Sequence, residues 1–376
     1  MRIAFVSTYP PIECGIGTYT SYLNEALKHH HNETFIISYV GAQGENVFAI
    51  ASLDSHSLAS DIFDVSDKIT PDVVHIQHEF GLYGNQKGVQ VVELLLRYRL
   101  VGEPVVITLH TVKPEIPPDE QIILRILVSE SQAIIVHERS QKDTLVKLFG
   151  QSRKIHVIPH GVRELSAISE AKQKIKLTNN KIILLCGYFR PSKGFHKIVK
   201  WFPEIAKKCP GTILVIAGKS RGLQYREYQS AFFQLINNSP ANDKIEVLRG
   251  QFPQHTFDTI ISAADLIVLP YEAGAQSGIM AQCLAFHKPV VTSDLPAFQR
   301  LIDESGGGYV AKSKQDYIQK ISKIINDDNL RQRLQNNIKK HVKKQVNWST
   351  IAEQHIKVYQ SVVKVPYGKA RHVFIE

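Results

Sequence analysis

The stretch of residues 266–296 constrains the fold more than any other part of the chain. It consists of a short apolar strand, a glycine-containing loop, a helix and a second strand, at residues 266–269, 271–278, 279–286 and 290–292. Short β-branched strands joined through a helix are typical of a parallel sheet that helices cover on both faces. In such sheets ligands bind where a loop leaves the carboxyl end of a strand, and the N–H groups that open the next helix favour an anion such as phosphate. The stretch therefore predicts an α/β fold with an anion-binding loop.

The same alternation of apolar strands and helices recurs along both halves of the chain. Further strands are expected at residues 2–7, 34–37, 73–77, 105–109, 133–136 and 155–158, and then at residues 181–187, 212–217 and 245–248. This order predicts two parallel sheets built from βαβ units, and a length of 376 residues suits two domains.

A polar, Lys-rich segment at residues 163–180 marks the boundary between the two halves. We therefore predict an N-terminal Rossmann-like domain at residues 1–165 and a C-terminal Rossmann-like domain at residues 166–349. The remaining residues, 350–376, form a helix with one apolar face and a tail.

Cysteine usage and the apolar runs indicate a cytoplasmic protein. The four cysteines are scattered without a C-x-x-C pair, which is typical of reduced thiols: Cys14, Cys186, Cys209 and Cys283. The apolar run at the N-terminus is too short for a signal peptide. No run reaches the roughly 18–20 apolar residues that a membrane span needs.

The net charge of +10 fits a polyanionic ligand, an anionic membrane surface or nucleic acid. Residues 331–346 carry six Lys and Arg and no acid on an expected helix. Two interpretations stay open: a solvated helix face, or peripheral attraction to the inner face of an anionic membrane that carries a lipid-linked acceptor. Nucleic-acid binding is not expected, because no basic stretch is interleaved with the aromatic residues that base stacking needs.

A Pro- and Gly-rich loop at residues 9–18 follows the first strand and precedes a helix that runs to about His29. Gly15 and Gly17 look like half of a dinucleotide-binding fingerprint, but the third glycine and the acid about 20 residues later are missing. A nicotinamide site of the usual kind is therefore not expected. A tight turn without a ligand is one interpretation of the pair.

Histidines mark the ends of two expected strands. His75 and His78 are three residues apart on one strand and point to opposite faces, so they are a poor metal pair, and no metal site is expected. His110 directly follows the strand at residues 105–109, at the carboxyl end where ligands bind. Its two interpretations are a hydrogen-bonded structural residue and a ligand contact.

Two cations flank a turn after the strand at residues 181–187. Arg190 and Lys193 are three residues apart, with Gly194 next, at another carboxyl end of a strand. Charge-assisted bonds to phosphate are strong, so two cations directed into a cleft suit a diphosphate better than they suit a solvated surface.

Several of these segments resemble one family. The run LAFHKPVVTSDLPAF after the helix at residues 279–286, the Arg190…Lys193-Gly194 turn and the VIPHGV segment at residues 157–162 are similar to segments of retaining glycosyltransferases of the GT-B fold, family 4. The resemblance implies two Rossmann-like domains facing across a cleft, with the last helix returning to the N-terminal domain. The chain departs from the family in having Gln282 in place of the second Glu, and in a spacing of ten residues from Glu272 to Gln282 where the family usually has eight.

The resemblance also implies roles for individual residues. Arg190 and Lys193 would contact the diphosphate of the donor, which Gly15 and Gly17 would face. His110 would touch the donor sugar. Other donor contacts would come from the loop and helix after residue 270, namely Glu272 near the sugar, Gln282 near the ribose, Gln276 and Ser277 in the longer loop, and the amides of Gly278 and Ile279. His78 and Glu79 would line the acceptor side.

The implied function is a metal-independent, retaining transfer of a sugar, expected to be a hexose, from a nucleoside-diphosphate sugar to an acceptor hydroxyl. The partners would be the nucleotide-sugar donor and a glycan or lipid-linked acceptor. No cofactor is expected, because the nucleotide sugar is a substrate. Two alternatives stay open: another GT-B enzyme, such as an epimerase or a phosphorylase, and a non-catalytic nucleotide-sugar-binding protein.

Overall fold

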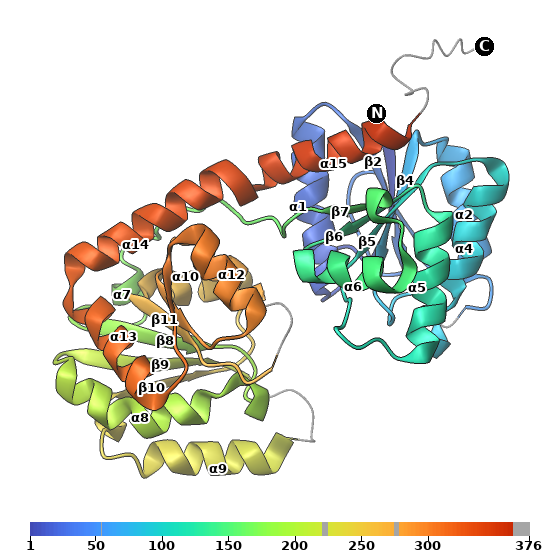
Figure 1. Cartoon of the computed structure of the whole chain (residues 1–376). Coiled ribbons are helices and arrows are strands. Elements are labelled where there is room, and N and C mark those ends of the chain that lie inside the picture. Colours follow the sequence, from blue (N-terminus) through green and yellow to red (C-terminus); the bar gives the residue numbers. More distant parts are fainter. Residues whose placement is uncertain (54, 220–224, 274–277, 364–376) are drawn as a thin grey trace. The chain divides into compact units, whose positions relative to one another are not determined.

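The computed structural model describes residues 1–53, 55–219, 225–273 and 278–363. The chain divides into two compact units. Unit 1 contains Met1–Gly161 and the chain from Trp348 onward, and unit 2 is Val162–Asn347. Each unit is built on one parallel sheet covered by helices (Figure 1).

Unit 1 contains a seven-stranded parallel sheet in the order β3-β2-β1-β4-β5-β6-β7. Its strands are β1 (Arg2–Val6), β2 (Glu33–Tyr39), β3 (Val47–Ala51), β4 (Val73–His78), β5 (Val105–Leu109), β6 (Ala133–Val136) and β7 (Ile155–Val157). Its helices are α1 (Gly15–His29), α2 (Leu58–Ile69), α3 (Asn85–Gly88), α4 (Gln90–Val101), α5 (Pro118–Glu130), α6 (Arg139–Phe149) and α15 (Trp348–Val362), with a short 3₁₀ turn at Ser152–Lys154.

Strand alternation divides the core of unit 1 between the two faces of its sheet. Ala4 and Val6 of β1 pack with residues of α2, α4 and α5, whereas Ile3 and Phe5 pack with α1 and α15. Helix α15, which is far from α1 in the sequence, lies beside it (Figure 1). Both helices bury apolar faces on the same side of the sheet, so the last described helix is part of the unit 1 core.

Unit 2 contains a six-stranded parallel sheet in the order β10-β9-β8-β11-β12-β13. Its strands are β8 (Lys181–Cys186), β9 (Thr212–Gly218), β10 (Ile245–Arg249), β11 (Leu266–Leu269), β12 (Val290–Thr292) and β13 (Gly308–Val310). Its α-helices are α7 (Ala171–Lys174), α8 (Phe195–Lys208), α9 (Arg226–Asn237), α10 (Gln254–Ala263), α11 (Gly278–Ala285), α12 (Pro296–Ser305), α13 (Lys314–Asn326) and α14 (Asp328–His341). Short 3₁₀ turns lie at Pro191–Lys193 (η2) and Asn242–Lys244 (η4), and Val342–Val346 (η5) forms a short π-helix.

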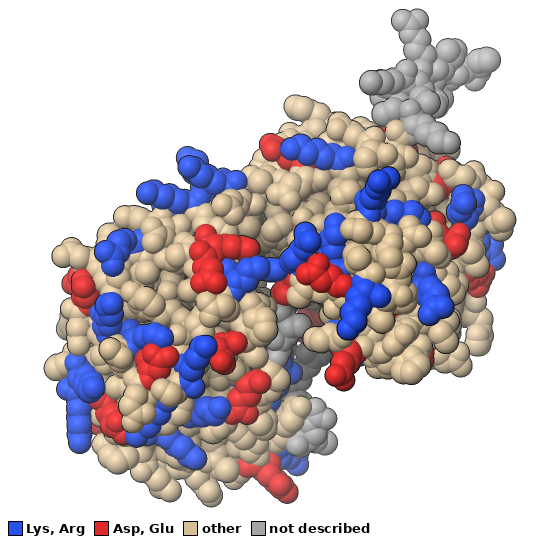
Figure 2. All heavy atoms as spheres, viewed as in Figure 1, with Lys and Arg blue, Asp and Glu red and all other residues tan. Residues whose placement is uncertain are grey.

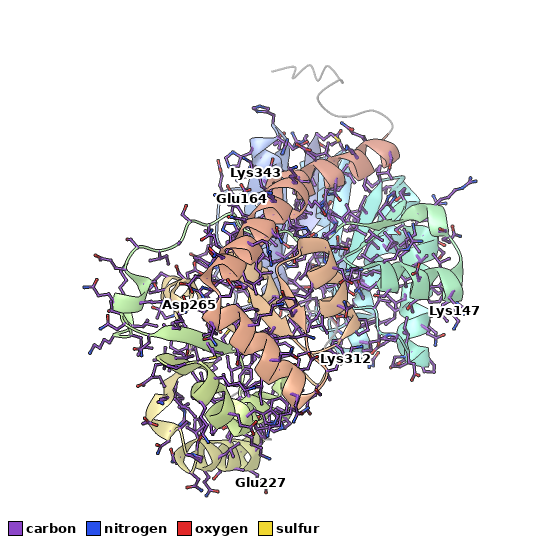
Figure 3. The ribbon with its side chains drawn as sticks, turned by 60° about the vertical axis from the view of Figure 1, so that its left-hand side comes forward. Lys147, Glu164, Glu227, Asp265, Lys312 and Lys343 are labelled. Atoms are coloured by element: carbon purple, nitrogen blue, oxygen red, sulfur yellow. The ribbon has the colours of Figure 1, made fainter. Side chains whose placement is uncertain are left out.

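One hydrophobic core joins the strands of unit 2 to the helices on both faces of its sheet. Polar contacts fix the ends of its strands. Asp265, labelled in Figure 3, accepts a hydrogen bond from the N–H of Ile182 at 2.8 Å and pairs with Lys172 of α7 at 2.6 Å. These bonds tie the start of β8 to the start of β11, the two strands whose carboxyl ends carry the candidate site.

The predicted fold class of two parallel α/β sheets is confirmed, as is the packing of the last helix on the N-terminal domain. Three details differ from the expectation. Strands β3 and β13 were not predicted from the sequence, and α1 begins at Gly15, so the expected loop at residues 9–18 ends earlier. Among the described residues, no helix combines the length and the apolar character that crossing a membrane requires.

Candidate functional site

The turn η2 places two cations at the carboxyl end of β8. Its tight form requires glycine at position 194, where φ is +63° and an added Cβ would lie 1.9 Å from the carbonyl oxygen of Pro270. The N–H groups of Lys193 and Gly194 donate to the carbonyls of Arg190 and Pro191, at 3.1 and 2.9 Å. The turn is therefore packed directly against the segment that follows β11.

Lys193 is buried and Arg190 is half-buried, and neither has an anionic partner among the contacts of the described residues. Lys193 is 9% exposed, and its ammonium lies 3.5 Å from the centre of the Tyr271 ring. Burial, together with the neighbouring charge of Arg190, lowers the pKa of Lys193 to about 8. The Nε atom of Arg190 is buried and has no hydrogen-bond partner among the described residues. Buried cationic groups of this kind are costly unless an anion pairs with them, so the turn is suited to bind one.

The loop after β11 is held to the same turn. The N–H of Glu272 donates to the carbonyl of Ser192 at 2.9 Å. The carboxylate of Glu272 pairs with Lys197 of α8 at 2.9 Å and lies 3.6 Å from His196. Glu272 therefore adjoins the predicted diphosphate turn, but its side chain is turned toward α8.

A pocket of about 440 Å³ lies beside Glu272 in unit 2. Its lining comes from the carboxyl ends of β11 and β12 and from helices α8 and α13, and includes Lys197, Trp201, Tyr271, Glu272, Asp294, Lys312 and Tyr317. Lys312, labelled in Figure 3, adds another cation to this edge of the sheet.

Gln282 lies on α11 and belongs to a polar contact that the sequence did not predict. Its side-chain carbonyl accepts a hydrogen bond from Arg163. Arg163 also donates to both carboxylate oxygens of Asp258, at 3.0 and 2.8 Å. Of the other predicted donor residues, Gly278 and Ile279 open α11, whereas Gln276 and Ser277 lie outside the described residues.

Substitution of Gln282 tests its predicted place near the ribose of the donor. We expect Gln282→Glu to keep or improve donor affinity, because a carboxylate accepts bonds from two hydroxyls at once. We expect Gln282→Leu to weaken donor affinity about tenfold, the loss of roughly one hydrogen bond. Calorimetric titration of the two variants with the donor measures both effects. If Gln282→Leu bound the donor as tightly as the wild type does, Gln282 would not be part of the donor site.

His110 extends from the end of β5 in unit 1. Its Nε2 atom lies 2.8 Å from Oε1 of Gln77, and its Nδ1 atom lies 3.4 Å from Nε2 of His137. The ring also meets Tyr19 edge-on, with the ring centres 5.0 Å apart. Burial, followed by the neighbouring histidines, holds the pKa of His110 well below its usual range, so its imidazole is neutral at pH 7.

The glycine pair lies in the first turn of α1, close to the end of β1. A Cβ at Gly17 would lie 3.2 Å from backbone atoms of Thr8 and Tyr9, closer than a side chain ordinarily allows, whereas Gly15 faces open space. Gly17 therefore permits the close approach of helix and strand, and the open position of Gly15 leaves its backbone accessible.

His78 and Glu79 lie in different environments. His78 is fully buried in β4, where its ring packs against Phe80 and Tyr83, and burial lowers its pKa to about 4. Glu79 accepts hydrogen bonds from Thr111 and from the N–H of Phe80. Of the two predicted acceptor-side residues, Glu79 is therefore the one that lies at the end of the sheet, beside the loop that carries His110.

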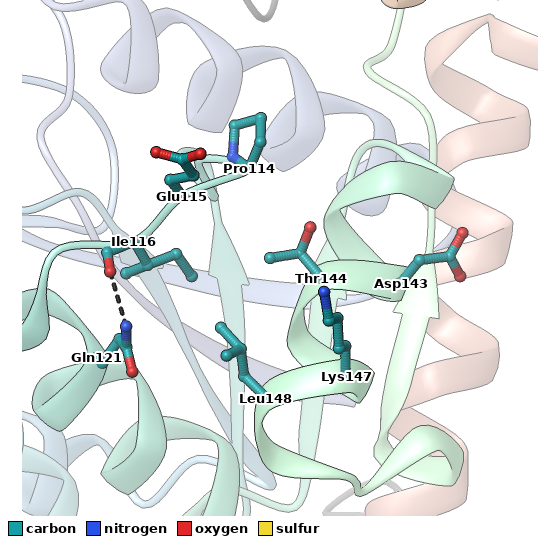
Figure 4. Close-up of a pocket in the computed structure, with 8 residues that line it drawn as sticks. All are labelled: Pro114, Glu115, Ile116, Gln121, Asp143, Thr144, Lys147 and Leu148. Atoms are coloured by element: carbon teal, nitrogen blue, oxygen red, sulfur yellow. Dashed lines mark hydrogen bonds between the residues drawn. The ribbon is translucent and has the colours of Figure 1, made fainter.

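A second pocket, of about 450 Å³, lies in unit 1 between the segment after β5 and helices α5 and α6. Figure 4 shows Glu115 and Lys147 among its lining residues, and the hydrogen bond from Gln121 to the carbonyl of Ile116, 2.7 Å long, that holds one wall. In the part of the chain that the structure describes, no group of three or more His, Cys, Asp and Glu could hold a metal ion.

Two family models match the chain, one for each half. Residues 15–164 match glycosyltransferase family 4, and residues 167–341 match the glycosyl transferases group 1. An uncharacterised glycosyltransferase of Methanocaldococcus jannaschii is 26% identical over 251 residues, which are 63% of this chain and 62% of that protein. The phosphatidyl-myo-inositol mannosyltransferase of Mycobacterium tuberculosis is 24% identical over 71% of this chain and 70% of its own length. The chain thus spans less than two thirds of the M. jannaschii relative.

Solved structures of low sequence identity share the fold. A glycosyltransferase from Rickettsia africae is 16% identical with a TM-score of 0.77, covering 96% of this chain and 98% of its own. Anabaena HepE in complex with UDP is also 16% identical, with a TM-score of 0.73 and coverages of 96% and 100%. The two family matches and these structures agree with the two sheets described above. The chain therefore belongs to the group 1 glycosyltransferases of family 4 and has the GT-B fold.

Proposed function

We propose that this protein is a retaining glycosyltransferase that moves a sugar from a nucleoside-diphosphate sugar to an acceptor hydroxyl. The observation that carries the proposal is the pair of cations at the end of β8, a buried Lys193 beside a half-buried Arg190 whose Nε has no hydrogen-bond partner among the described residues. Arg190 and Lys193 lie in one turn of four residues, and neither has an anionic partner among the described contacts. A diphosphate supplies the negative charge that such a pair requires.

The same cations favour the reaction as well as binding. Departure of the nucleoside diphosphate places negative charge on its phosphate oxygens. Fixed positive charge at those oxygens stabilises the transition state more than the ground state, since the charge grows as the bond to the sugar breaks. The N–H groups that open α11, at Gly278 and Ile279, add partial positive charge at the neighbouring strand end. Gly15 of α1 would face the same diphosphate.

His110 acts on the sugar in this proposal. Its neutral ring is held by Gln77 and His137 at the carboxyl end of β5. A held, uncharged imidazole suits a hydrogen bond with a sugar hydroxyl and orients the anomeric carbon without adding charge. Glu79, on the neighbouring strand end, belongs to the acceptor side.

The names of relatives indicate classes of donor and acceptor. HepE binds UDP in the solved complex, and the mycobacterial relative is a phosphatidylinositol mannosyltransferase. We extend the proposal to a hexose donor and to a glycan or lipid-linked acceptor. Basic residues near the end of α14 and in η5 would assist peripheral contact with an anionic membrane: Lys339, Lys340, Lys343 and Lys344. On the face in Figure 2, Lys and Arg are interspersed with Asp and Glu.

Turnover should persist in excess EDTA, because Arg190 and Lys193 supply the positive charge at the diphosphate. The measurement is release of nucleoside diphosphate from a panel of nucleotide sugars, after a thermal-shift screen has identified the donor that stabilises the protein. Activity that disappeared with EDTA and returned with Mg²⁺ or Mn²⁺ would contradict this part of the proposal.

One observation favours a second candidate, a nucleotide-sugar-binding protein without catalysis. The carboxylate of Glu272 is paired with Lys197, and Gln282 replaces the family's second Glu. Donor hydrolysis without acceptor separates the two candidates. A donor that raises the melting temperature but is not hydrolysed, with or without acceptors, would favour the binding protein.

A further inference from the structure

A chain of buried polar side chains extends behind His110 in unit 1. Its members come from the ends of β4, β5 and β6 and from α15, and they are His75, Gln77, His110, His137 and Tyr359. All but His110 are at most 3% exposed. Buried polar groups need hydrogen-bond partners, so the donors and acceptors of this chain must match along its length.

One end of the chain is fixed by a backbone carbonyl. Nδ1 of His137 lies 3.0 Å from the carbonyl oxygen of Ile158. A carbonyl oxygen only accepts, so Nδ1 must carry the proton. Burial lowers the pKa of His137 to about 3, and the ring is therefore neutral with a single N–H. The other nitrogen of His137, Nε2, is consequently an acceptor.

The backbone of His137 is held as firmly as its ring. The N–H groups of His137 and Glu138 both donate to Oε1 of Gln141, each at 2.9 Å. This arrangement begins helix α6 and leaves the His137 ring directed at His110. The acceptor nitrogen therefore has a fixed position.

The acceptor on His137 decides the tautomer of His110. The two facing atoms, Nε2 of His137 and Nδ1 of His110, are 3.4 Å apart. Since the first can only accept, the second must donate. A neutral His110 that carries its proton on Nδ1 has an unprotonated Nε2.

The other neighbours accommodate this tautomer. In the structure Oε1 of Gln77 lies 2.8 Å from Nε2 of His110, and Nε2 of Gln77 lies 3.3 Å from Nε2 of His75. This tautomer requires the amide to be turned by about 180° from that placement, which exchanges its oxygen and nitrogen at nearly the same positions; with NH₂ toward His110 and the carbonyl toward His75, each contact joins one donor to one acceptor. His75 then donates from Nε2 to the Gln77 carbonyl and to the Thr108 hydroxyl, which lies 2.8 Å away, and its Nδ1 accepts from the Tyr359 hydroxyl at 2.7 Å.

We infer that His137 is a positioning residue that holds His110 in the Nδ1–H tautomer, so that Nε2 of His110 accepts a hydrogen bond from a hydroxyl of the donor sugar. The step to the sugar rests on the proposed function, whereas the tautomer follows from the hydrogen bonds of unit 1 alone. A sugar hydroxyl that displaces the Gln77 amide meets an acceptor already in place.

The test is ¹⁵N-labelling of the histidines in the full chain, with long-range ¹H–¹⁵N correlation spectra that distinguish the two tautomers. His110→Gln identifies the His110 signals by their loss. We expect Nδ1–H on His110 in the wild type and in His137→Gln, whose amide oxygen still accepts. We expect Nε2–H in His137→Leu, because Nδ1 then has no acceptor and Oε1 of Gln77, which faces His110 in the structure, can accept from Nε2. An Nε2–H signal on wild-type His110 would overturn the inference even if His137→Leu failed to fold.

Turnover provides the second readout. We expect His137→Leu to lower kcat at least tenfold with unchanged affinity for the bare nucleoside diphosphate, and His137→Gln to restore most of kcat. His156→Leu, which alters a half-buried histidine on β7, is the matched control and should leave both unchanged. Equal kcat in His137→Leu and wild type would overturn the assigned role. Wild-type protein that shows the Nδ1–H tautomer but turns over no nucleotide sugar would refute the proposed function and leave the tautomer established.

Discussion

Lys193→Ala should lower kcat/KM for the nucleotide sugar by about 100-fold or more, the scale seen when one fixed donor to a developing oxyanion is removed, roughly 3–4 kcal/mol. Lys193 is 9% exposed and has the charge of Arg190 beside it. A bound diphosphate relieves that repulsion and accepts a hydrogen bond from the ammonium group. The loss of kcat/KM therefore includes both weaker binding and weaker stabilisation of the transition state. Steady-state kinetics with the donor varied gives the number.

The control for this variant is Lys200→Ala, which removes an exposed lysine from α8, the helix that follows the turn η2. Its kcat/KM should stay within about twofold of wild type, since an exposed charge contributes little. A loss below about tenfold in Lys193→Ala, or an equal loss in both variants, would contradict the assignment of the diphosphate turn.

His110→Ala should reduce turnover about 100-fold while binding of the bare nucleoside diphosphate changes less than twofold. The imidazole contacts the transferred sugar in our account, and misplacing a reacting group by a small distance can cost a factor of this size. The bare nucleoside diphosphate lacks the sugar, so its affinity should not depend on His110. Kinetics and calorimetry on the same preparation give the two values.

Two further variants separate this role from a structural one. His110→Ala leaves Gln77 and His137 without a partner and is expected to lower stability by about 1–3 kcal/mol. His110→Gln retains hydrogen-bonding groups and should recover stability more than turnover. His156→Ala on β7 should change neither. Parallel losses of turnover and of nucleoside-diphosphate binding in His110→Ala would indicate that His110 only supports the fold.

The strand–turn–helix units of unit 2 could be predicted because their signals are local. The apolar runs of β8 and β11 have the predicted positions, and Arg190, Lys193 and Gly194 follow β8 directly in the sequence. A parallel sheet brings the carboxyl ends of neighbouring strands to one edge, and β8 and β11 are neighbours in the sheet of unit 2. The bond between Glu272 and Ser192 joins the turn after β8 to the loop after β11.

Contacts that depend on distant residues could not be predicted. Arg163 is 95 residues from Asp258 and 119 residues from Gln282 along the chain, and no local sequence pattern links the three. The role of His137 was missed for the same reason, because its partners lie on other strands. Its sequence signal was a histidine directly after a buried strand, the same signal that identified His110.

Two other differences between the sequence-based expectation and the structure come from close packing in the core. The family resemblance placed His78 on the acceptor side, whereas β4 is buried on both faces and the ring of His78 lies in the core. The segment around Gly15 and Gly17 was interpreted as a loop because glycine disfavours helices. The close approach of α1 to Thr8 requires glycine at position 17, and the helix forms despite its low propensity.

The central claim is that this chain cleaves a nucleotide sugar with retention of configuration at the anomeric carbon. The most direct measurement is ¹H NMR in real time of the sugar that the wild-type protein releases from its donor in the absence of acceptor, recorded before mutarotation equilibrates the anomers. Our account predicts that an α-linked donor releases the α anomer first. Release of the β anomer first, or no release of sugar from any donor that binds, would contradict it.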